Sequence, residues 1–99
     1  MADDPSEIRF EWDAQKAAVN AGKHGVTFEE ASTVFYDDDA KIGDDPDHSE
    51  GEHRELIFGR SAEGRWLLVI FTERNDAIRI IHAREASKRE RKRYEEDIL

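Results

Sequence analysis

The hydrophobic residues of this chain are concentrated in two runs in its second half. The first run, residues 66–71, has six apolar residues in succession, with aromatic and β-branched members, which is typical of a strand buried on both faces. We expect it to be the central strand of a sheet. The second run, residues 77–84, mixes three isoleucines with Arg79, His82 and Arg84. It predicts a strand that presents polar groups as well as a core face.

Two shorter elements are predicted near the N-terminus. Residues 8–12 alternate apolar and polar side chains, which predicts a strand whose three apolar residues face inward. Asp13 is a suitable N-cap for a short alanine-rich helix over residues 14–21. Gly22 is placed to end that helix.

A second helix is predicted to begin after Thr27, because Thr27 and Glu30 have the spacing of a capping box. Its apolar residues fall on one face at helical spacing; they are Phe28, Ala31, Val34 and Phe35. We expect both helices to cover one side of the sheet.

The remaining segments complete the predicted fold. Residues 37–51 predict a solvated loop, since seven of them are acidic and few are apolar. Residues 54–60 predict a strand, and residues 61–64 a hairpin loop in which Gly64 takes a positive φ. The order of elements predicts a single α+β domain over residues 1–99, with a small antiparallel sheet, two N-terminal helices packed on it and a C-terminal helix.

The predicted C-terminal helix, from Ala86 onward, carries its charges in the reverse of the order that a helix dipole favours. Its end is acidic, whereas its early turns contain the basic residues Lys88, Arg89, Arg91, Lys92 and Arg93. Since this order costs the helix stability, we expect the basic residues to bind a polyanion or an acidic partner. The alternative is a helix face that is merely solvated.

The net charge of −9 is unevenly distributed along the chain. Residues 1–55 have 16 acidic and 5 basic residues, a net −11, whereas residues 56–99 have 8 acidic and 10 basic residues, a net +2. Residues 79–93 reach +5, from seven basic and two acidic side chains. Because screening limits charge interactions to about 8 Å at physiological salt, this basic segment can bind phosphate on an acidic protein.

Several classes of site are disfavoured. The chain has no cysteine, so disulfides and thiolate metal sites are excluded. It has neither an apolar run of about 20 residues nor a signal-peptide pattern, which predicts a cytoplasmic protein without membrane contact. The acidic segment fails the calcium-loop pattern, since Ile42 stands where glycine is required, and His48 and His53 lack the spacing of a helical zinc pair. We expect neither a metal nor another cofactor.

The basic residues of the second half suit cleavage of RNA without a metal. Such cleavage needs a base for the 2'-hydroxyl, donors for the charge on phosphorus and an acid for the departing 5'-oxygen. His82, with a reference pKa of about 6.5, suits the proton transfer. A guanidinium suits phosphate, and four candidate catalytic arginines lie at or near the ends of predicted strands: Arg65, Arg74, Arg79 and Arg84. Lys23 and His24 would bind RNA together with the basic helix.

Strand geometry sets a condition on this site. In an unbroken strand Arg79 points to the opposite face from His82 and Arg84, so all three share one pocket only at the strand end or across a bulge. Structural roles stay open. Arg79 could pair with Glu90, His82 could be a hydrogen-bonded, partly buried residue, and Tyr94 is expected in the core.

Ordered short motifs extend over residues 10–95. They are F-E-W-D at 10–13, N-A-G-K-H-G-V-T-F-E-E-A at 20–31, H-S at 48–49, Arg54, G-R at 64–65, T-E-R at 72–74, R-I-I-H-A-R at 79–84 and E-R-K-R-Y-E at 90–95. Together they resemble the BrnT family of ribonuclease toxins. That family's pattern more often has serine at the position of His82 and Glu-Glu-Arg where this chain has residues 52–54.

The resemblance implies a RelE-like fold and a small endoribonuclease toxin that inhibits translation. It also implies a hetero-oligomer with a BrnA-like antitoxin that has a DNA-binding domain. The alternative is a non-catalytic module that docks an acidic or DNA-binding partner through its basic C-terminal helix. Arginines on the strands favour the ribonuclease, since docking through the helix would not require Arg74, Arg79 and Arg84 near a histidine.

Overall fold

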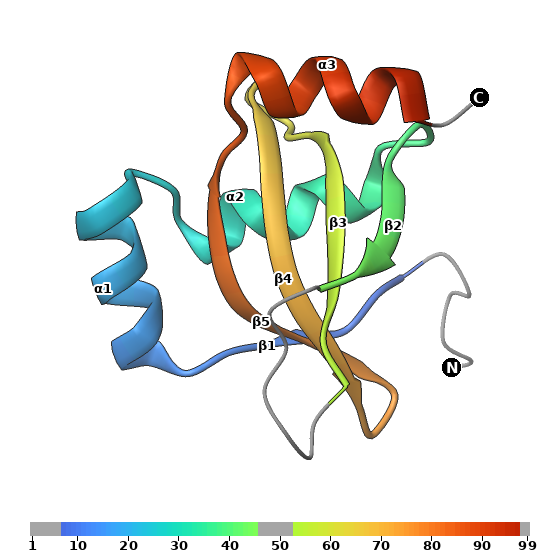
Figure 1. The fold of residues 1–99 in the computed structure, drawn as a ribbon. Helices are drawn as coiled ribbons and strands as arrows, with labels where there is room; N and C mark the ends of the chain where they lie inside the picture. The colour runs from blue at the N-terminus through green and yellow to red at the C-terminus, as the bar shows by residue number, and fades with distance from the viewer. Residues whose placement is uncertain (1–6, 46–52, 98–99) are drawn as a thin grey trace.

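The computed structural model describes residues 7–45 and 53–97, which form one five-stranded sheet and three α-helices (Figure 1). In chain order the elements are β1 (Phe10–Glu11), α1 (Ala14–His24), α2 (Phe28–Thr33), a 3-10 turn η1 (Val34–Tyr36), β2 (Lys41–Asp44), β3 (Glu55–Arg60), β4 (Trp66–Arg74), β5 (Ala77–Glu85) and α3 (Lys88–Asp97). The α+β class is therefore confirmed.

The sheet is mixed, so the prediction of a purely antiparallel sheet was wrong. Its order is β1-β5-β4-β3-β2, and β4 is the central strand, as predicted. Strands β2 to β5 form antiparallel pairs, whereas β1 pairs with β5 in parallel. Consecutive hairpins give antiparallel pairs only among strands joined by short loops. The strand β1 is separated from β5 by two α-helices and three strands, so no local sequence pattern indicates that the two strands pair.

The strand β2 occupies part of the segment predicted to be a loop. It pairs with β3 along four residues, from Lys41 opposite Phe58 to Asp44 opposite Glu55. Its side chains are mostly exposed, and Ile42 has 61% of its surface accessible. An edge strand needs little buried surface, so hydrophobic pattern gave no signal for it. Residues 46–51 of the predicted loop lie outside the described residues.

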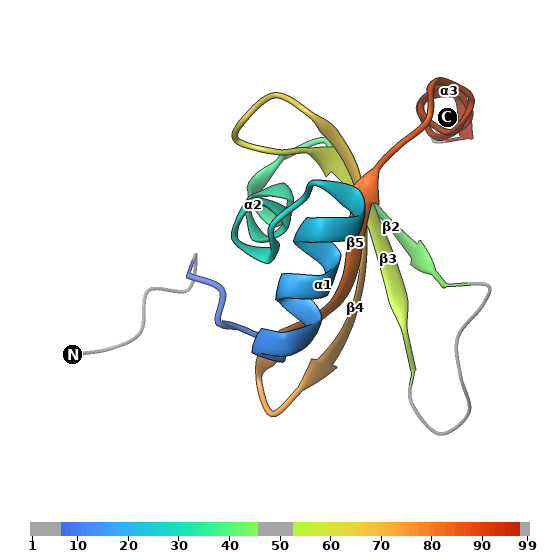
Figure 2. The same cartoon turned by 90° about the vertical axis from the view of Figure 1, so that its left-hand side faces the viewer.

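The first helix differs from its prediction in both end and position. Asp13 is its N-cap and accepts a bond from the Lys16 N–H. The helix passes Gly22 and ends at Gly25, which has φ 69° and donates its N–H to the Ala21 carbonyl. Of the two N-terminal helices, only α2 lies across a face of the sheet, while α1 lies beside the edge of β5 (Figures 1 and 2). The prediction that both helices cover one side was therefore wrong.

Asn20 attaches α1 to that edge. Its amide nitrogen donates to the carbonyls of Ala83 (2.8 Å) and Val26 (2.9 Å), and its amide oxygen accepts from the Ala83 N–H (3.1 Å). The side chain thus makes the two bonds that a neighbouring strand would make to Ala83. It fixes the last turn of α1, with His24, against β5.

Hydrophobic residues pack on both faces of the sheet. The main cluster lies on the α2 side and comprises Val26, Phe28, Ala31, Val34, Ile57, Leu67, Val69, Phe71, Ile80 and Ala83. The opposite face has a smaller cluster of Leu56, Phe58 and Leu68, with Trp66, Ile70, Ala86 and Tyr94 beside it. Helix α3 lies over one end of this opposite face (Figure 2). We call the part between α1 and α3 the open face.

Candidate active site

A β-bulge in β5 determines which side chains reach the open face. The Cα partners are Ile70 with His82 but Phe71 with Ile80, so Ile81 is an extra residue. A bulge shifts the alternation of side chains by one position. Arg79 lies opposite Thr72, and it therefore shares the open face with His82 and Arg84. The bulge that strand geometry required is therefore present, and the three side chains share one face of the sheet.

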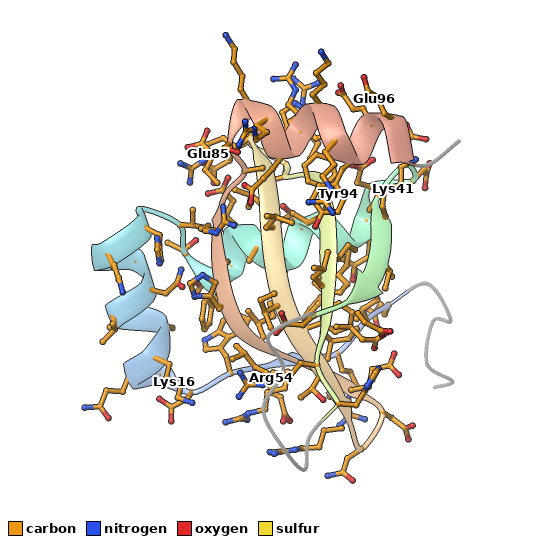
Figure 3. All side chains as sticks on the ribbon, viewed as in Figure 1. Lys16, Lys41, Arg54, Glu85, Tyr94 and Glu96 are labelled. Atoms are coloured by element: carbon orange, nitrogen blue, oxygen red, sulfur yellow. The ribbon has the colours of Figure 1, made fainter. Side chains whose placement is uncertain are left out.

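The open face contains a groove of about 680 Å³ between the sheet and α3. Its lining combines four aliphatic residues of the strands with titratable residues of α1, β5, α3 and the ends of β2 and β3: Lys16, Asp45, Arg54, His82, Arg84, Glu90 and Arg93, beside Tyr94. Figure 3 shows Lys16 on α1, Arg54 at the start of β3 and Tyr94 under α3 on this side of the molecule. Four cations against two carboxylates make the groove suited to an anion.

A second cavity of about 480 Å³ lies between α1 and β5, and we call it the α1 pocket. It is lined by Asp13, Gln15, Lys16, Val19, Asn20, Lys23, His24, Ile81 and His82. Lys16, Ile81 and His82 line both the groove and the α1 pocket. The two cavities therefore meet at His82.

The surroundings of His82 favour its neutral form. Its ring lies edge-on to that of His24, with 4.8 Å between ring centroids and an interplanar angle of 82°. Burial, followed by the nearby His24, Arg84 and Lys23, lowers the pKa of His82 below its usual value, while Asp45 acts in the opposite direction. A neutral imidazole is the form that accepts a proton.

Arg84 extends into the groove beside His82 and is paired with Glu90 of α3. Its two terminal nitrogens lie 2.8 and 2.7 Å from the two Glu90 carboxylate oxygens. The same carboxylate accepts from the Ser87 N–H, and the Ser87 hydroxyl accepts from the Glu90 N–H. The Arg84 pair, followed by this capping box, lowers the pKa of Glu90 to about 2. Glu90 is therefore ionised at neutral pH.

Arg79 forms an ion pair with Glu11 of β1, at 3.2 Å. The two residues are register partners of the parallel β1–β5 pair. The suggested pairing of Arg79 with Glu90 was therefore wrong, because the bulge and the entry of α3 bring Arg84 to Glu90 instead. Arg79 remains on the same face of the sheet as His82, but it lines neither the groove nor the α1 pocket. The backbone N–H of Lys16 lowers the pKa of Asp13, and Arg79 adds a smaller effect in the same direction.

The other two candidate arginines lie apart from this site. Arg65 is tied to the α2 side: its guanidinium donates to the buried Glu30 carboxylate (3.0 Å) and to the Gly25 carbonyl (2.9 Å). Glu30 also accepts from the Ser61 hydroxyl at 2.7 Å. Arg74 is exposed beside the β4–β5 turn, with a cavity of about 440 Å³ formed there by residues of the turn and Ile8.

In a comparison of the sequence with protein-family models, residues 12–90 match the ribonuclease toxin BrnT of type II toxin–antitoxin systems. This chain belongs to the BrnT family. The matched range includes α1, α2, the strands β2 to β5 and the first residues of α3. Members of this family are ribonuclease toxins, and the type II system implies an antitoxin partner and an RNA substrate.

The BrnT fold is also found by structural comparison. The crystal structure of the Brucella abortus ribonuclease toxin BrnT has a TM-score of 0.64, 24% sequence identity, and coverage of 83% of this chain and 100% of that chain. At this identity the likeness establishes the fold. No curated protein matches the sequence.

The basic residues predicted to bind RNA divide into two groups in this BrnT fold. Lys23 and His24 line the α1 pocket, and Arg93 lines the groove. The other basic residues of α3 surround a depression on a different side of the helix; they are Lys88, Arg89, Arg91 and Lys92, with Glu95 beside them. Arg91 also lies over the Trp66 ring, 5.4 Å from its centroid. The helix therefore presents one cation to the site and most of its cations elsewhere.

Two cations of the site were not among the predicted residues. Lys16 lies one and two turns before Asn20 and Lys23, at the spacing of a single helix face, and this spacing was a usable signal. Arg54 precedes β3 and has the same parity as Leu56 and Phe58, which pack on the open face. Strand alternation therefore assigned Arg54 to that face, although one cation before a strand is a weak signal.

Neither a metal cluster nor a membrane helix occurs in the part of the chain that the structure describes. Within residues 7–45 and 53–97, no three side chains of histidine, aspartate or glutamate are grouped as metal ligands would be. Of the helices in the same residues, none has the length and apolar character to cross a membrane.

Proposed function

We propose that this BrnT-family toxin is a metal-independent endoribonuclease in which the 2'-hydroxyl of the RNA attacks the adjacent phosphorus. The observation that carries the proposal is the convergence of His82 and Arg84 with Arg54 and Lys16 around one groove. Together these residues offer a proton acceptor and several phosphate donors. Metal-free RNA cleavage needs these two kinds of group.

In the proposed reaction His82 removes the proton from the 2'-hydroxyl. The 2'-oxygen forms a bond to phosphorus as the bond to the 5'-oxygen breaks, and a proton is delivered to the departing 5'-oxygen. His24, whose ring contacts that of His82, is our candidate for the second proton carrier. The products are a 2',3'-cyclic phosphate and a 5'-hydroxyl.

The arginines divide into reacting and structural groups in this proposal. Arg84 and Arg54 neutralise the extra charge on the phosphoryl oxygens, and Arg79 acts on the same face from the β1 side. Charge-assisted donors of this kind commonly contribute about 3–4 kcal/mol to transition-state stabilisation. We assign structural roles to Arg65, which holds Glu30, and to Arg74 at its turn, in place of the catalytic roles that their sequence positions favoured.

RNA contacts and an antitoxin complete the proposal. Lys16, Lys23 and Arg93 bind the flanking phosphates, and the outer face of α3 is available to an acidic partner. We propose that this partner is a BrnA-like antitoxin with a DNA-binding domain, which forms a hetero-oligomer with the toxin in the cytoplasm and prevents it from blocking translation. The exposed cations of α3 are the feature that supports docking there.

The reaction is tested with purified protein and a synthetic RNA. We expect cleavage to persist in EDTA, to leave a 2',3'-cyclic phosphate or its 3'-phosphate product, and to fail on DNA and on 2'-O-methyl RNA, because both lack the attacking hydroxyl. Mass spectrometry of the fragment ends checks this. Cleavage of the methylated RNA, or activity that is abolished by EDTA and restored by a divalent ion, would contradict the mechanism.

A further inference from the structure

The α1 pocket has an apolar surface beside the proposed reaction centre. Because of the bulge, the consecutive residues Ile81 and His82 both line this pocket. Ile81 is only partly buried. In a regular strand the alternation of side chains would have placed Ile81 on one face or the other. Its aliphatic side chain forms a wall of both the pocket and the groove.

The opposite wall is Val19 of α1. Its side chain is 63% exposed, which is high for a valine. Lys16 and Lys23 lie on the same face of α1 as Val19, at spacings of three and four residues from it, and Asn20 follows Val19 directly. The aliphatic surfaces of Val19 and Ile81 therefore have cations at their rim.

The remaining polar groups define what can be recognised. Asn20 uses both its nitrogen and its oxygen to hold Ala83 and Val26, so it forms the floor. Asp13 accepts the Lys16 N–H as the cap of α1. The exposed side chain of Gln15 also lines the pocket, and its amide can both donate to and accept from the edge of a planar ligand.

We propose that the α1 pocket binds one unpaired nucleobase of the RNA substrate, adjacent to the phosphate that is cleaved at His82. The inference rests on the proposed ribonuclease function and names its substrate class as single-stranded RNA. A base has apolar faces and a polar edge, which match the aliphatic walls and the polar rim. A phosphate would gain nothing from Val19 and Ile81.

Continuity between the two cavities fixes the position of the base relative to the cleaved bond. Lys16, Ile81 and His82 belong to both cavities, so a chain whose phosphate lies in the groove at His82 reaches the α1 pocket with its neighbouring nucleotide. A base in a duplex is stacked and paired, and it enters such a pocket only after it is extruded. Duplex RNA is therefore a poor substrate.

The test uses binding to a 2'-O-methyl oligonucleotide, which does not depend on the cleavage step. Fluorescence anisotropy compares the intact oligonucleotide with versions that have an abasic ribose 5' or 3' of the target phosphate. We expect one abasic position to weaken binding about tenfold or more, the range typical of one stacked base. In NMR spectra the methyl resonances of Val19 and Ile81 should shift upfield with the intact oligonucleotide and not with that abasic version.

A matched pair of variants separates the pocket from general effects. Val19→Gln removes one apolar wall and keeps a good helix former, so it should reduce the abasic penalty to about twofold. Ala18→Gln introduces the same side chain at the preceding exposed position, which does not line the pocket, and should leave the penalty unchanged. An abasic penalty that is absent in the wild type, or equal in the wild type and Val19→Gln, overturns the inference.

The ribonuclease proposal is judged by a separate result. Cleavage of unmodified RNA together with unchanged binding of the abasic oligonucleotides would leave the ribonuclease and remove the base pocket. Loss of binding at the abasic position without any cleavage of unmodified RNA would leave a base-binding pocket and remove the ribonuclease. Tight binding of the same RNA as a duplex would contradict the single-stranded substrate class.

Discussion

His82 and Arg84 each have a neighbour that determines what they can do in the reaction. Burial, followed by the nearby His24 and Arg84, lowers the pKa of His82 and so favours its neutral form. Arg84 in turn is engaged by Glu90 through both terminal nitrogens. An incoming phosphate therefore meets a base that is already deprotonated and a guanidinium whose fork is occupied by a carboxylate. The phosphate must share Arg84 with Glu90 or replace it.

The lowered pKa of His82 gives a pH dependence with a definite sign. A base with a depressed pKa stays deprotonated to lower pH, so the cleavage rate should fall only as the pH drops below the usual value of 6.5. In His24→Gln one source of the depression is removed, and the midpoint of the pH–rate profile should move upward. Single-turnover rates between pH 4.5 and 8 measure both midpoints.

Lys88→Gln, on the outer side of α3, is the control and should leave the midpoint in place. A wild-type midpoint above 6.5, or a profile that persists in His82→Ala, would assign the titration to another group.

Arginine-to-lysine substitutions separate phosphate contacts from structural ones. Arg84→Lys keeps the charge and loses the paired donors of the guanidinium, so cleavage should fall about ten- to a thousandfold. Stability should fall less than in Arg65→Lys, because a lysine can still pair with Glu90. Arg65→Lys weakens the support of the buried Glu30 carboxylate, and should lower the free energy of unfolding by about 1–3 kcal/mol while the rate at permissive temperature is retained. Thermal denaturation and single-turnover assays measure both effects. The opposite pattern would place the chemistry on the α2 side of the sheet.

At the level of residues, the sequence identified the types of side chain in the site better than their grouping. His82 and Arg84 were predictable because polar groups interrupt an otherwise apolar strand. Arg65 has the same local pattern, at the start of a strand, yet its partner Glu30 lies 35 residues away. No local feature of the sequence distinguishes a guanidinium that binds a buried carboxylate from one that can bind a phosphate.

Helix α3 is the element that is least firmly attached to the fold. Its contact with the core runs mainly through Tyr94, whose ring stacks on Phe58 at 4.8 Å between centroids, and Phe58 stacks in turn on Trp66. Its start is fixed by the Ser87–Glu90 capping box and by Arg84. One buried aromatic ring contributes about 2 kcal/mol, so the polar contacts of Glu90 are a large part of what holds this helix.

Acid should release α3 before the sheet unfolds. The folded pKa of Glu90 is about 2 against an ordinary 4.5, so its contribution to stability is fully present above pH 4.5 and is lost as the pH falls toward 2. We expect the fluorescence of Trp66, followed in a Trp12→Phe background, to change in this window while the far-UV signal of the sheet persists.

Glu90→Gln retains an amide for the cap but cannot ionise. The acid step in Trp66 fluorescence should therefore be absent in this variant, whereas Glu95→Gln, near the end of the helix, should retain it. A step of the same size in Glu90→Gln would show that other carboxylates attach α3.

At the level of elements, the accuracy with which a strand was predicted depended on the amount of apolar surface that it buries. The strands β3, β4 and β5 were predicted within a few residues because each has a long apolar stretch. In the turn between β4 and β5, Asn75 and Asp76 both have positive φ (52° and 64°), as the commonest two-residue hairpin requires. The exposed strand β2 left no such pattern, whereas the alternation over residues 8–12 predicted a strand that contains the two residues of β1. The bulge at Ile81 adds one residue and no recognisable composition.

For the whole molecule, function depends on where charge lies more than on its sum. The chain has a net charge of −9, yet the groove is lined by four cations and two carboxylates. Several described acidic residues of the first half lie outside the groove, among them Glu29 on α2 and Asp38 after it. Along the sequence, acidic and basic residues are separated only in part. The fold separates them further, because cations gather at the groove while these carboxylates lie elsewhere. The RelE-like relationship that the motifs imply stays a prediction.

The hydrogen bonds between Asn20 and Ala83 have a consequence for the self-association of this protein. An open strand edge is a template on which a second chain can add its own strand, and this is a common start of aggregation. Beyond its two residues of pairing with β1, β5 would present such an edge at Ala83, but the amide of Asn20 occupies that peptide group. A single side chain thus protects the reactive strand from unwanted self-association, at a point where a neighbouring strand would also have closed the α1 pocket.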